Sequence, residues 1–151
     1  MPQSLVRVLV HIVFSTKYRV PFLGTETLRK RVHGYLAETM RGLDSHVVVV
    51  GGTEDHIHGL CTLPKNLKPT EFIGKVKSAS SKWAKGLSRE LDDFYWQAGF
   101  AMFSVSESKV PVVTSYIENQ MEHHKTISFQ DELRTLLRKH GVGFDEQYLW
   151  D

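Results

Sequence analysis

The sequence predicts an α+β domain in which helices pack on one face of an antiparallel sheet. Segments of alternating apolar residues and segments of helical spacing follow one another in the order strand, helix, strand, strand, helix, strand, with further helices after them. That order is the split β-α-β pattern of the ferredoxin-like fold, in which the first and third strands are central neighbours. The length of 151 residues and the apolar fraction of 41% fit one domain with a real core.

The first half of the chain is expected to hold a strand, a helix and a two-stranded hairpin. Thr25 can cap the helix and Gly42 can end it. Gly51 and Gly52 are expected to form the tight turn of the hairpin. The predicted ranges are 5–14 for the first strand, 25–40 for the helix, and 46–50 and 53–63 for the two strands of the hairpin.

The second half is expected to hold a helix, a fourth strand and two further helices. Pro69 and Pro111 can each occupy the first turn of a helix, and Ser128 can cap the last one. Gly99 interrupts the strand pattern. The predicted ranges are 69–87 for the second helix, 95–105 for the strand, and 111–124 and 129–140 for the last two helices.

The most informative motif is a pair of histidines in the third predicted strand. His56 and His58 are two residues apart, so their side chains share one face, roughly 7 Å apart along the strand. Two such imidazoles can bind one divalent metal ion, and His11 of the first strand is expected beside them. Because the chain contains eight histidines, a chance pair of partly exposed strand histidines is the alternative.

A possible nucleophile lies in the third predicted helix. Tyr116 and Gln120 are four residues apart and therefore share a helix face. The amide oxygen could complete the metal coordination, and the phenol could attack a phosphate held by the metal. A tyrosine nucleophile suits phosphodiesters, but its pKa near 10 requires help from a metal or a base. Ordinary packing of the tyrosine is the alternative.

Acids and histidines near these motifs are further candidates. Glu54 is expected to lie on the same strand face as the histidine pair, where it could reach the metal. The alternative is an exposed acid in a turn. Asp55 should point the other way and cap or pair locally. His123 and His124 end the tyrosine helix and could contact DNA or the helix terminus; a plain surface position is the alternative.

The distribution of charge suggests a contact with a polyanion, although the net charge is only +2. Residues 65–89 contain seven basic side chains and a single acid, so either a polyanion site or a solvated lysine-rich helix face is expected there. A second candidate combines positive charge with an aromatic ring, which suits single-stranded DNA. The candidate DNA contacts are Lys17, Tyr18, Arg19, Lys75, Lys82 and Lys85.

The cellular setting is expected to be the cytoplasm. Cys61 is the only cysteine, so no intrachain disulfide can form and a reducing compartment fits. The polar N-terminus lacks the pattern of a signal peptide, and no apolar run approaches the roughly 20 residues that a membrane helix needs.

These motifs together resemble the single-tyrosine HUH-type transposases of small bacterial insertion sequences (the transposase A family), which move as single-stranded DNA. Gly59 departs from the usual bulky aliphatic residue after the second histidine; it is expected to face the helices and to affect packing more than chemistry. The segments that carry the resemblance are 11–19, 54–58, 77–83, 116–120, 122–125, 128–132, 137–141 and 148–150.

The resemblance implies that residues 1–151 form a single HUH transposase domain. It implies that His56, His58 and Gln120 bind Mg²⁺ or Mn²⁺ and that Tyr116 attacks the scissile phosphate, forming a 5′-phosphotyrosine and releasing a 3′-hydroxyl. Its implied partners are single-stranded DNA with hairpins at the element ends and a second copy of the chain in a homodimer. The tyrosine could act in its own subunit or in the partner's.

Other functions stay open from the sequence. One is a domesticated endonuclease that cleaves hairpin DNA and is not mobile. Another is a non-catalytic nucleic-acid-binding protein of the same fold, although the chain lacks the aromatic-rich strand motif of RNA recognition domains. The third is a metal-dependent hydrolase in which water attacks instead of Tyr116.

Overall fold

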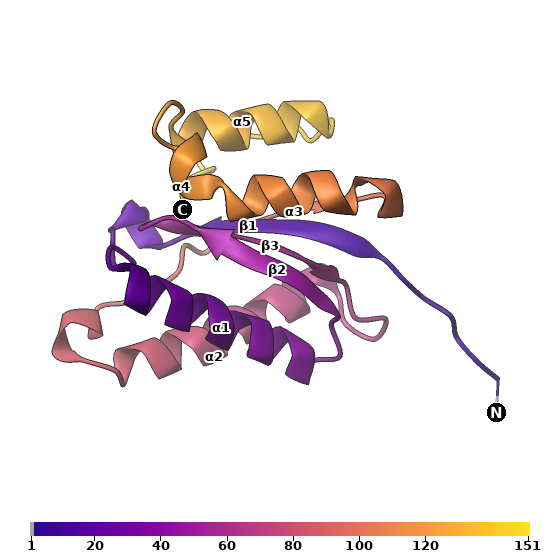
Figure 1. Ribbon diagram of the computed structural model, residues 1–151, viewed down its shortest axis with the longest axis horizontal. Helices are drawn as coiled ribbons and strands as arrows, with labels where there is room; N and C mark the ends of the chain where they lie inside the picture. The colour runs from indigo at the N-terminus through magenta and orange to yellow at the C-terminus, as the bar shows by residue number, and fades with distance from the viewer. Residues whose placement is uncertain (1) are drawn as a thin grey trace.

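A computed structural model describes residues 2–151 and has a four-stranded antiparallel sheet between two helical layers (Figure 1). The strands are β1 (Leu9–Ser15), β2 (Val47–Gly52), β3 (His56–Thr62) and β4 (Ala101–Ser104). Their spatial order is β2-β3-β1-β4, so the first and third strands are central neighbours. The predicted ferredoxin-like α+β fold is therefore confirmed.

Helices cover both faces of the sheet, so the prediction that they pack on one face needs correction: the C-terminal helices bury a second apolar cluster, which includes Val13 and Phe103, on the other face. Helices α1 (Glu26–Gly42) and α2 (Pro69–Lys85) lie on one face; α3 (Val110–Glu118), the short α4 (Gln120–His123) and α5 (Phe129–Lys139) lie on the other (Figure 1). The predicted caps form, since the side chains of Thr25 and Ser128 accept backbone hydrogen bonds at the starts of α1 and α5. Within residues 2–151, no helix combines the length and apolar character that crossing a membrane requires.

Three predicted boundaries were wrong, each for a physical reason. The first strand begins at Leu9 rather than Leu5, because its pairing with β3 ends at Thr62 and only one backbone hydrogen bond, from Leu63 to Val8, lies beyond it; Leu5 is 87% exposed. The fourth strand keeps only four of its expected residues, since the backbone of Gly99 bonds to Asp151 instead of a strand. The tyrosine helix is interrupted at Asn119, which separates α3 from α4.

The role predicted for Gly51 and Gly52 also needs correction. Both residues belong to β2, and Thr53 to Asp55 form the turn of the hairpin. A Cβ on Gly51 would lie 2.5 Å from the backbone oxygen of Ile117, in α3. The glycine therefore allows the tyrosine-bearing helix to pack directly on the sheet.

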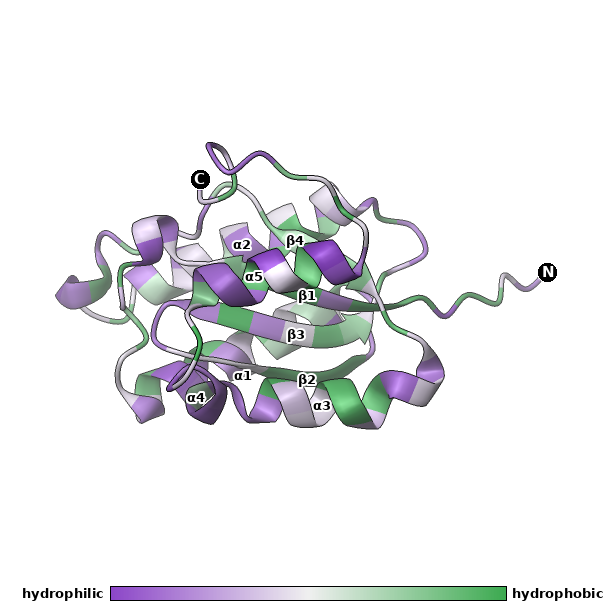
Figure 2. Ribbon diagram, turned by 90° about the horizontal axis from the view of Figure 1, so that it is seen from above, coloured by the Kyte–Doolittle hydropathy of each residue, from purple (hydrophilic) through white to green (hydrophobic). Residues whose placement is uncertain are grey.

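Alternation along the central strands gives the two faces different contents. One face of β1 and β3 contributes apolar side chains to the larger core, beneath α1 and α2. Gly59 lies on that face, where an added Cβ would meet Ile12, as expected for a residue that affects packing. Helix α5 covers the other face through a smaller apolar cluster (Figure 2). The buried members of that cluster are Val13, Phe103, Phe129, Leu133 and Leu137.

Candidate active site

The predicted histidine pair lies on the sheet face beneath α3 and α5. The register pairs His56 with Ser15 and His58 with Val13, so His11 projects from the neighbouring strand on the same side. His11 Nε2 and His58 Nδ1 are 2.7 Å apart, close enough for one ring to donate to the other. The exposed fractions of His56 and His58 are 1% and 0%. The expected proximity of the three imidazoles is confirmed.

Neighbouring side chains fix the orientation of His56. Its Nδ1–H donates to Asp55 Oδ1 at 2.8 Å, and Thr53 Oγ1 lies 2.9 Å from the same nitrogen. Asp55 therefore pairs locally, as predicted, and its partner is a site histidine. Glu54 is exposed and does not join the cluster, so its alternative interpretation as a turn acid holds. The Nε2 atom of His56 is left facing the interior of the site.

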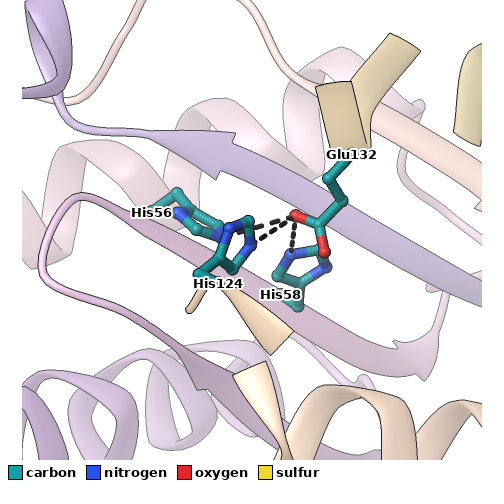
Figure 3. Close-up of side chains that lie close together, drawn as sticks. All are labelled: His56, His58, His124 and Glu132. Atoms are coloured by element: carbon teal, nitrogen blue, oxygen red, sulfur yellow. Dashed lines mark hydrogen bonds and ion pairs between the residues drawn. The ribbon is translucent and has the colours of Figure 1, made fainter. Parts of the chain in front are cut away.

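The carboxylate of Glu132, from α5, occupies the centre of the cluster (Figure 3). Its Oε1 atom lies 3.0 Å from His58 Nε2, 3.0 Å from His124 Nε2 and 3.5 Å from His56 Nε2. Its Oε2 atom lies 3.3 Å from His123 Nε2. One buried acid thus links the sheet with both C-terminal helices.

Tyr116 and Gln120 point into the same site although the helix is interrupted between them. Gln120 Oε1 lies 3.1 Å from His56 Nε2, and Gln120 Nε2 donates to Glu132 Oε2 at 3.0 Å. The Tyr116 hydroxyl donates to that same carboxylate oxygen. The expected convergence of the tyrosine, the amide and the histidine pair is therefore present within a single chain.

Burial and charge set the protonation of the site. Burial lowers the pKa of His58 to about 4, and burial together with the charge of His58 lowers the pKa of His11 to about 3. Burial also acts to lower the pKa of His56, but hydrogen bonds to Asp55 and Glu132 outweigh it and raise the pKa to about 9.

The phenol and the acid shift in opposite directions. Burial and the adjacent Glu132 carboxylate raise the pKa of Tyr116 above its ordinary value. Burial would raise the pKa of Glu132, but hydrogen bonds from His124, His56 and His58 lower it well below the usual range. The site therefore holds a carboxylate next to a protonated phenol, which needs assistance to become a nucleophile.

The donor set fits a divalent cation. His56, His58, His124 and Glu132 each offer one ligand atom, and these atoms lie within 4.8 Å of one another. Imidazole nitrogen and carboxylate oxygen are common ligands of divalent metals. The hydrogen bond from His56 to Asp55 is of the kind that orients histidines in metal sites.

The candidate DNA contacts separate into two groups. Lys17 and Tyr18 are exposed at the end of β1, where the Lys17 amide donates to the Tyr95 carbonyl at 2.7 Å. The Lys85 ammonium lies 3.7 Å from the centre of the Tyr95 ring, so this end of α2 joins the same surface. Arg19 instead stacks on Trp150, with its guanidinium carbon 5.6 Å from the ring centre.

Lys75 and Lys82 lie apart from the candidate active site. Both are exposed on α2, which covers the opposite face of the sheet (Figure 1). A single strand of DNA that touched either lysine and the site would have to pass around the edge of the sheet.

Sequence reasoning did not identify Glu132 as a site residue, and it left His123 and His124 as surface candidates. A signal was nevertheless present in the last helix. Glu132 falls within the apolar stripe of α5, between Phe129 and Leu133, where an acid is unusual. An acid on the buried face of an amphipathic helix requires a partner, and here the histidines provide it.

The sequence matches the family of IS200-like transposases over residues 4–120. The chain belongs to this family. It is 27% identical over 121 residues to the transposase of insertion sequence element IS200 from Salmonella typhimurium. The aligned region covers 76% of this chain and 78% of that protein. The IS200 transposase of Salmonella typhi gives the same figures.

Two solved structures share the fold of this IS200-like transposase. A crystal structure of a Deinococcus radiodurans protein assigned as a transposase has a TM-score of 0.61 and 19% identity, covering 80% of this chain and 95% of that chain. The structure of the REP-associated tyrosine transposase bound to a REP hairpin has a TM-score of 0.59 and 15% identity. The match covers 84% of this chain and 74% of that chain.

The family match contains His56, His58, Tyr116 and Gln120 but ends before His124 and Glu132. The resemblance stated from the sequence motifs is thus confirmed at the level of the family.

Proposed function

We propose that this IS200-like transposase cuts and rejoins single-stranded DNA at hairpin-marked ends through a covalent phosphotyrosine at Tyr116. One observation carries the proposal: the Tyr116 hydroxyl and the Nε2 atoms of His56 and His58 converge on one carboxylate, Glu132. A phenol that served only packing would have no reason to reach a buried cluster of metal-ligand type.

In the proposed reaction the Tyr116 oxygen attacks phosphorus. A bond forms between that oxygen and phosphorus, and the bond from phosphorus to the 3′-oxygen breaks. The phenolic proton leaves to solvent by way of the Glu132 carboxylate, which already accepts it in a hydrogen bond. The 5′-phosphate stays on the tyrosine, and the 3′-oxygen takes up a proton from water to leave as a hydroxyl. The later attack of a 3′-hydroxyl on this phosphotyrosine reverses the bonds and rejoins the strands.

Residues of the chain prepare the phenol for this step. The hydroxyl donates its hydrogen to Glu132, which leaves the oxygen lone pairs available to a phosphate. His56, His58 and Gln120 would hold Mg²⁺ or Mn²⁺, which would act as a Lewis acid toward the phosphate. Because the pKa of Tyr116 is raised, the reaction should be slow unless such a cation is present.

A pocket beside Tyr116 offers DNA a route to the phenol. It encloses about 360 Å³ and is lined by His11 and Tyr116, with Lys109, Lys139 and His140 at its rim. The two lysines would attract the phosphates that flank the cleavage position. We propose this pocket as the approach for the scissile strand.

The remaining DNA contacts are proposed at the end of β1 and along α2. Lys17, Tyr18 and Lys85 gather with Tyr95, which combines positive charge with rings on which bases can stack. Arg19, Lys75 and Lys82 are proposed as weaker backbone contacts, since Arg19 is engaged by Trp150 and the two lysines lie on the far face.

We also propose that Tyr116 acts in its own subunit, because it reaches the histidines of its own chain. A homodimer in the cytoplasm would then bring two complete sites together, so that two strand ends could be exchanged.

A denaturing gel tests the proposed chemistry. The protein is incubated with Mn²⁺ and 3′-labelled single-stranded DNA taken from the sequences that flank the gene. We expect a slow-migrating adduct that Tyr116→Phe and EDTA both abolish. Tyr148→Phe, at an exposed tyrosine, is the matched control and should keep the adduct.

Two results would contradict the proposal. One is an adduct that persists in Tyr116→Phe. The other is cleavage of the DNA by the wild-type protein with no adduct at any time, which would favour the metal-dependent hydrolase.

A further inference from the structure

The C-terminal part of the chain adds a carboxylate and a third imidazole to the histidine pair. We propose that Glu132 and His124 are additional ligands of the cation, so that the site binds Mn²⁺ in preference to Mg²⁺. The inference rests on the proposed function only in requiring that the site take a divalent cation. Both residues lie beyond residues 4–120, the part of the chain that matches the family.

Hydrogen-bond roles in the cluster favour a bound cation. His124 Nδ1 lies 2.8 Å from the Ile127 carbonyl, which can only accept, so the Nδ1–H donates there. In the neutral ring His124 Nε2 is then a bare acceptor, and it faces the Glu132 carboxylate at 3.0 Å. Two acceptors at this distance repel each other unless a cation or a proton lies between them.

His56 presents the same arrangement. Its Nδ1–H donates to Asp55, so Nε2 can face an acceptor only when it carries a second proton or binds a cation. That nitrogen faces two further acceptors, Gln120 Oε1 at 3.1 Å and Glu132 Oε1 at 3.5 Å. One divalent cation would satisfy all these acceptors together, whereas a proton satisfies only one pair.

The spacing of the acceptors suits a shared metal. Two ligand atoms that are each about 2.1 Å from one cation lie about 3.0 Å apart at a right angle and about 3.4 Å apart at a tetrahedral angle. The distances from Glu132 Oε1 to the nitrogens of His58, His124 and His56 are 3.0, 3.0 and 3.5 Å. The carboxylate oxygen and each imidazole nitrogen are therefore spaced as two ligands of one ion are (Figure 3).

The chemistry of the ligands sets the preference among metals. Three imidazoles and one carboxylate form a nitrogen-rich set, which favours transition metals, whereas Mg²⁺ prefers oxygen ligands and keeps much of its water. Glu132 has a second role through its other oxygen, Oε2, which accepts the Tyr116 hydrogen bond. It is thus a positioning residue that holds the nucleophile at a fixed distance from the cation.

Metal titration of the full chain without DNA tests the inference. Calorimetry would measure the dissociation constants of Mn²⁺ and Mg²⁺ for the wild type, Glu132→Gln and His124→Asn. We expect each substitution to weaken Mn²⁺ binding at least tenfold. His124→Asn removes a nitrogen ligand and should weaken Mg²⁺ binding less, so that the preference for Mn²⁺ narrows, whereas Glu132→Gln removes the carboxylate and should weaken Mg²⁺ binding at least as much. The exposed residues Glu122 and His46 offer matched controls, Glu122→Gln and His46→Asn, which should bind both ions as the wild type does.

A spectroscopic count of the imidazoles bound to Mn²⁺ keeps the inference testable if one variant does not fold. Electron spin echo modulation of bound Mn²⁺ reports the coordinated imidazole nitrogens, and His124→Asn should remove one of three. If Glu132→Gln does not fold, this measurement on His124→Asn decides the question. Tyr116→Phe should retain Mn²⁺ binding, because the phenol is not a ligand.

The outcomes separate this inference from the proposed function. Wild-type Mn²⁺ affinity in both variants, with only two imidazoles coordinated, would overturn the additional ligands even if the Tyr116 adduct forms. Loss of affinity in both variants would support them even if no DNA is cut.

Discussion

The two faces of the sheet are built from the same strands but meet opposite physical demands. Toward α1 and α2, β1 contributes Val10, Ile12 and Phe14 to an apolar core. The alternate residues of β1 point toward α3 and α5, and among them His11 lies beside His56 and His58 of β3. The first face gains free energy by excluding water, while the second buries charges that are tolerated only in partnership. Stability and chemistry are therefore separated by the thickness of one sheet.

The largest test of this separation substitutes one large side chain on each face. Phe72→Ala removes a fully buried ring beneath the sheet and should lower the free energy of unfolding by about 3–5 kcal/mol. Tyr116→Phe removes one hydrogen bond to the buried Glu132 carboxylate and should cost less, about 1.5 kcal/mol, while eliminating the DNA adduct. Chemical denaturation of both variants, with the adduct assay beside it, measures the contrast. Equal losses of stability would show that the two faces are not separated in this way.

A smaller effect is expected where the active-site layer contacts the sheet. Gly51→Ala would place a Cβ 2.5 Å from the Ile117 carbonyl and push α3 outward, which should cost about 1–3 kcal/mol and slow adduct formation. Gly34→Ala, in α1 with open space around it, is the matched control and should stabilise the chain by up to about 1 kcal/mol. Unchanged adduct formation in Gly51→Ala would mean that the position of α3 is not critical.

The smallest effect concerns a histidine on the side of the sheet away from the site. His33 Nε2 is buried without a hydrogen-bond partner among residues 2–151. Burial, assisted by the charge of Arg29, lowers the pKa of His33 to about 4. The unfolded chain therefore binds a proton more readily, so stability is complete above pH 6.5 and declines as the pH falls toward 4.

His33→Leu should reduce this acid sensitivity by on the order of 1 kcal/mol. Denaturation midpoints at pH 7 and pH 5 measure it, and an identical decline in wild type and variant would count against the assignment. His56 and His58 offer the contrast, since both ring nitrogens of each have partners.

Local patterns predicted the parts of the molecule that depend on nearest neighbours. Alternation in β1 and β3, together with the split β-α-β order, was sufficient to place His11 next to His58. Helical spacing likewise placed Tyr116 and Gln120 together, and both side chains donate to Glu132 Oε2 despite the interruption at Asn119.

Features that depend on distant packing could not be read from those patterns. Glu132 meets His58 from 74 residues away, and no local rule connects them. Gly51 resembled a turn residue because its reason for being glycine lies in α3, a separate part of the chain. The first strand was predicted too long since alternation does not reveal where its partner strand ends.

The order in which the ligands occur along the chain has a consequence for synthesis. His56 is translated 64 residues before Gln120, and His58 is translated 74 residues before Glu132. On a ribosome the sheet and its apolar underside can assemble while the nucleophile is still unmade. Under the proposed chemistry, the ability to break DNA is the last property that a growing chain acquires, and interrupted translation products are harmless to the chromosome.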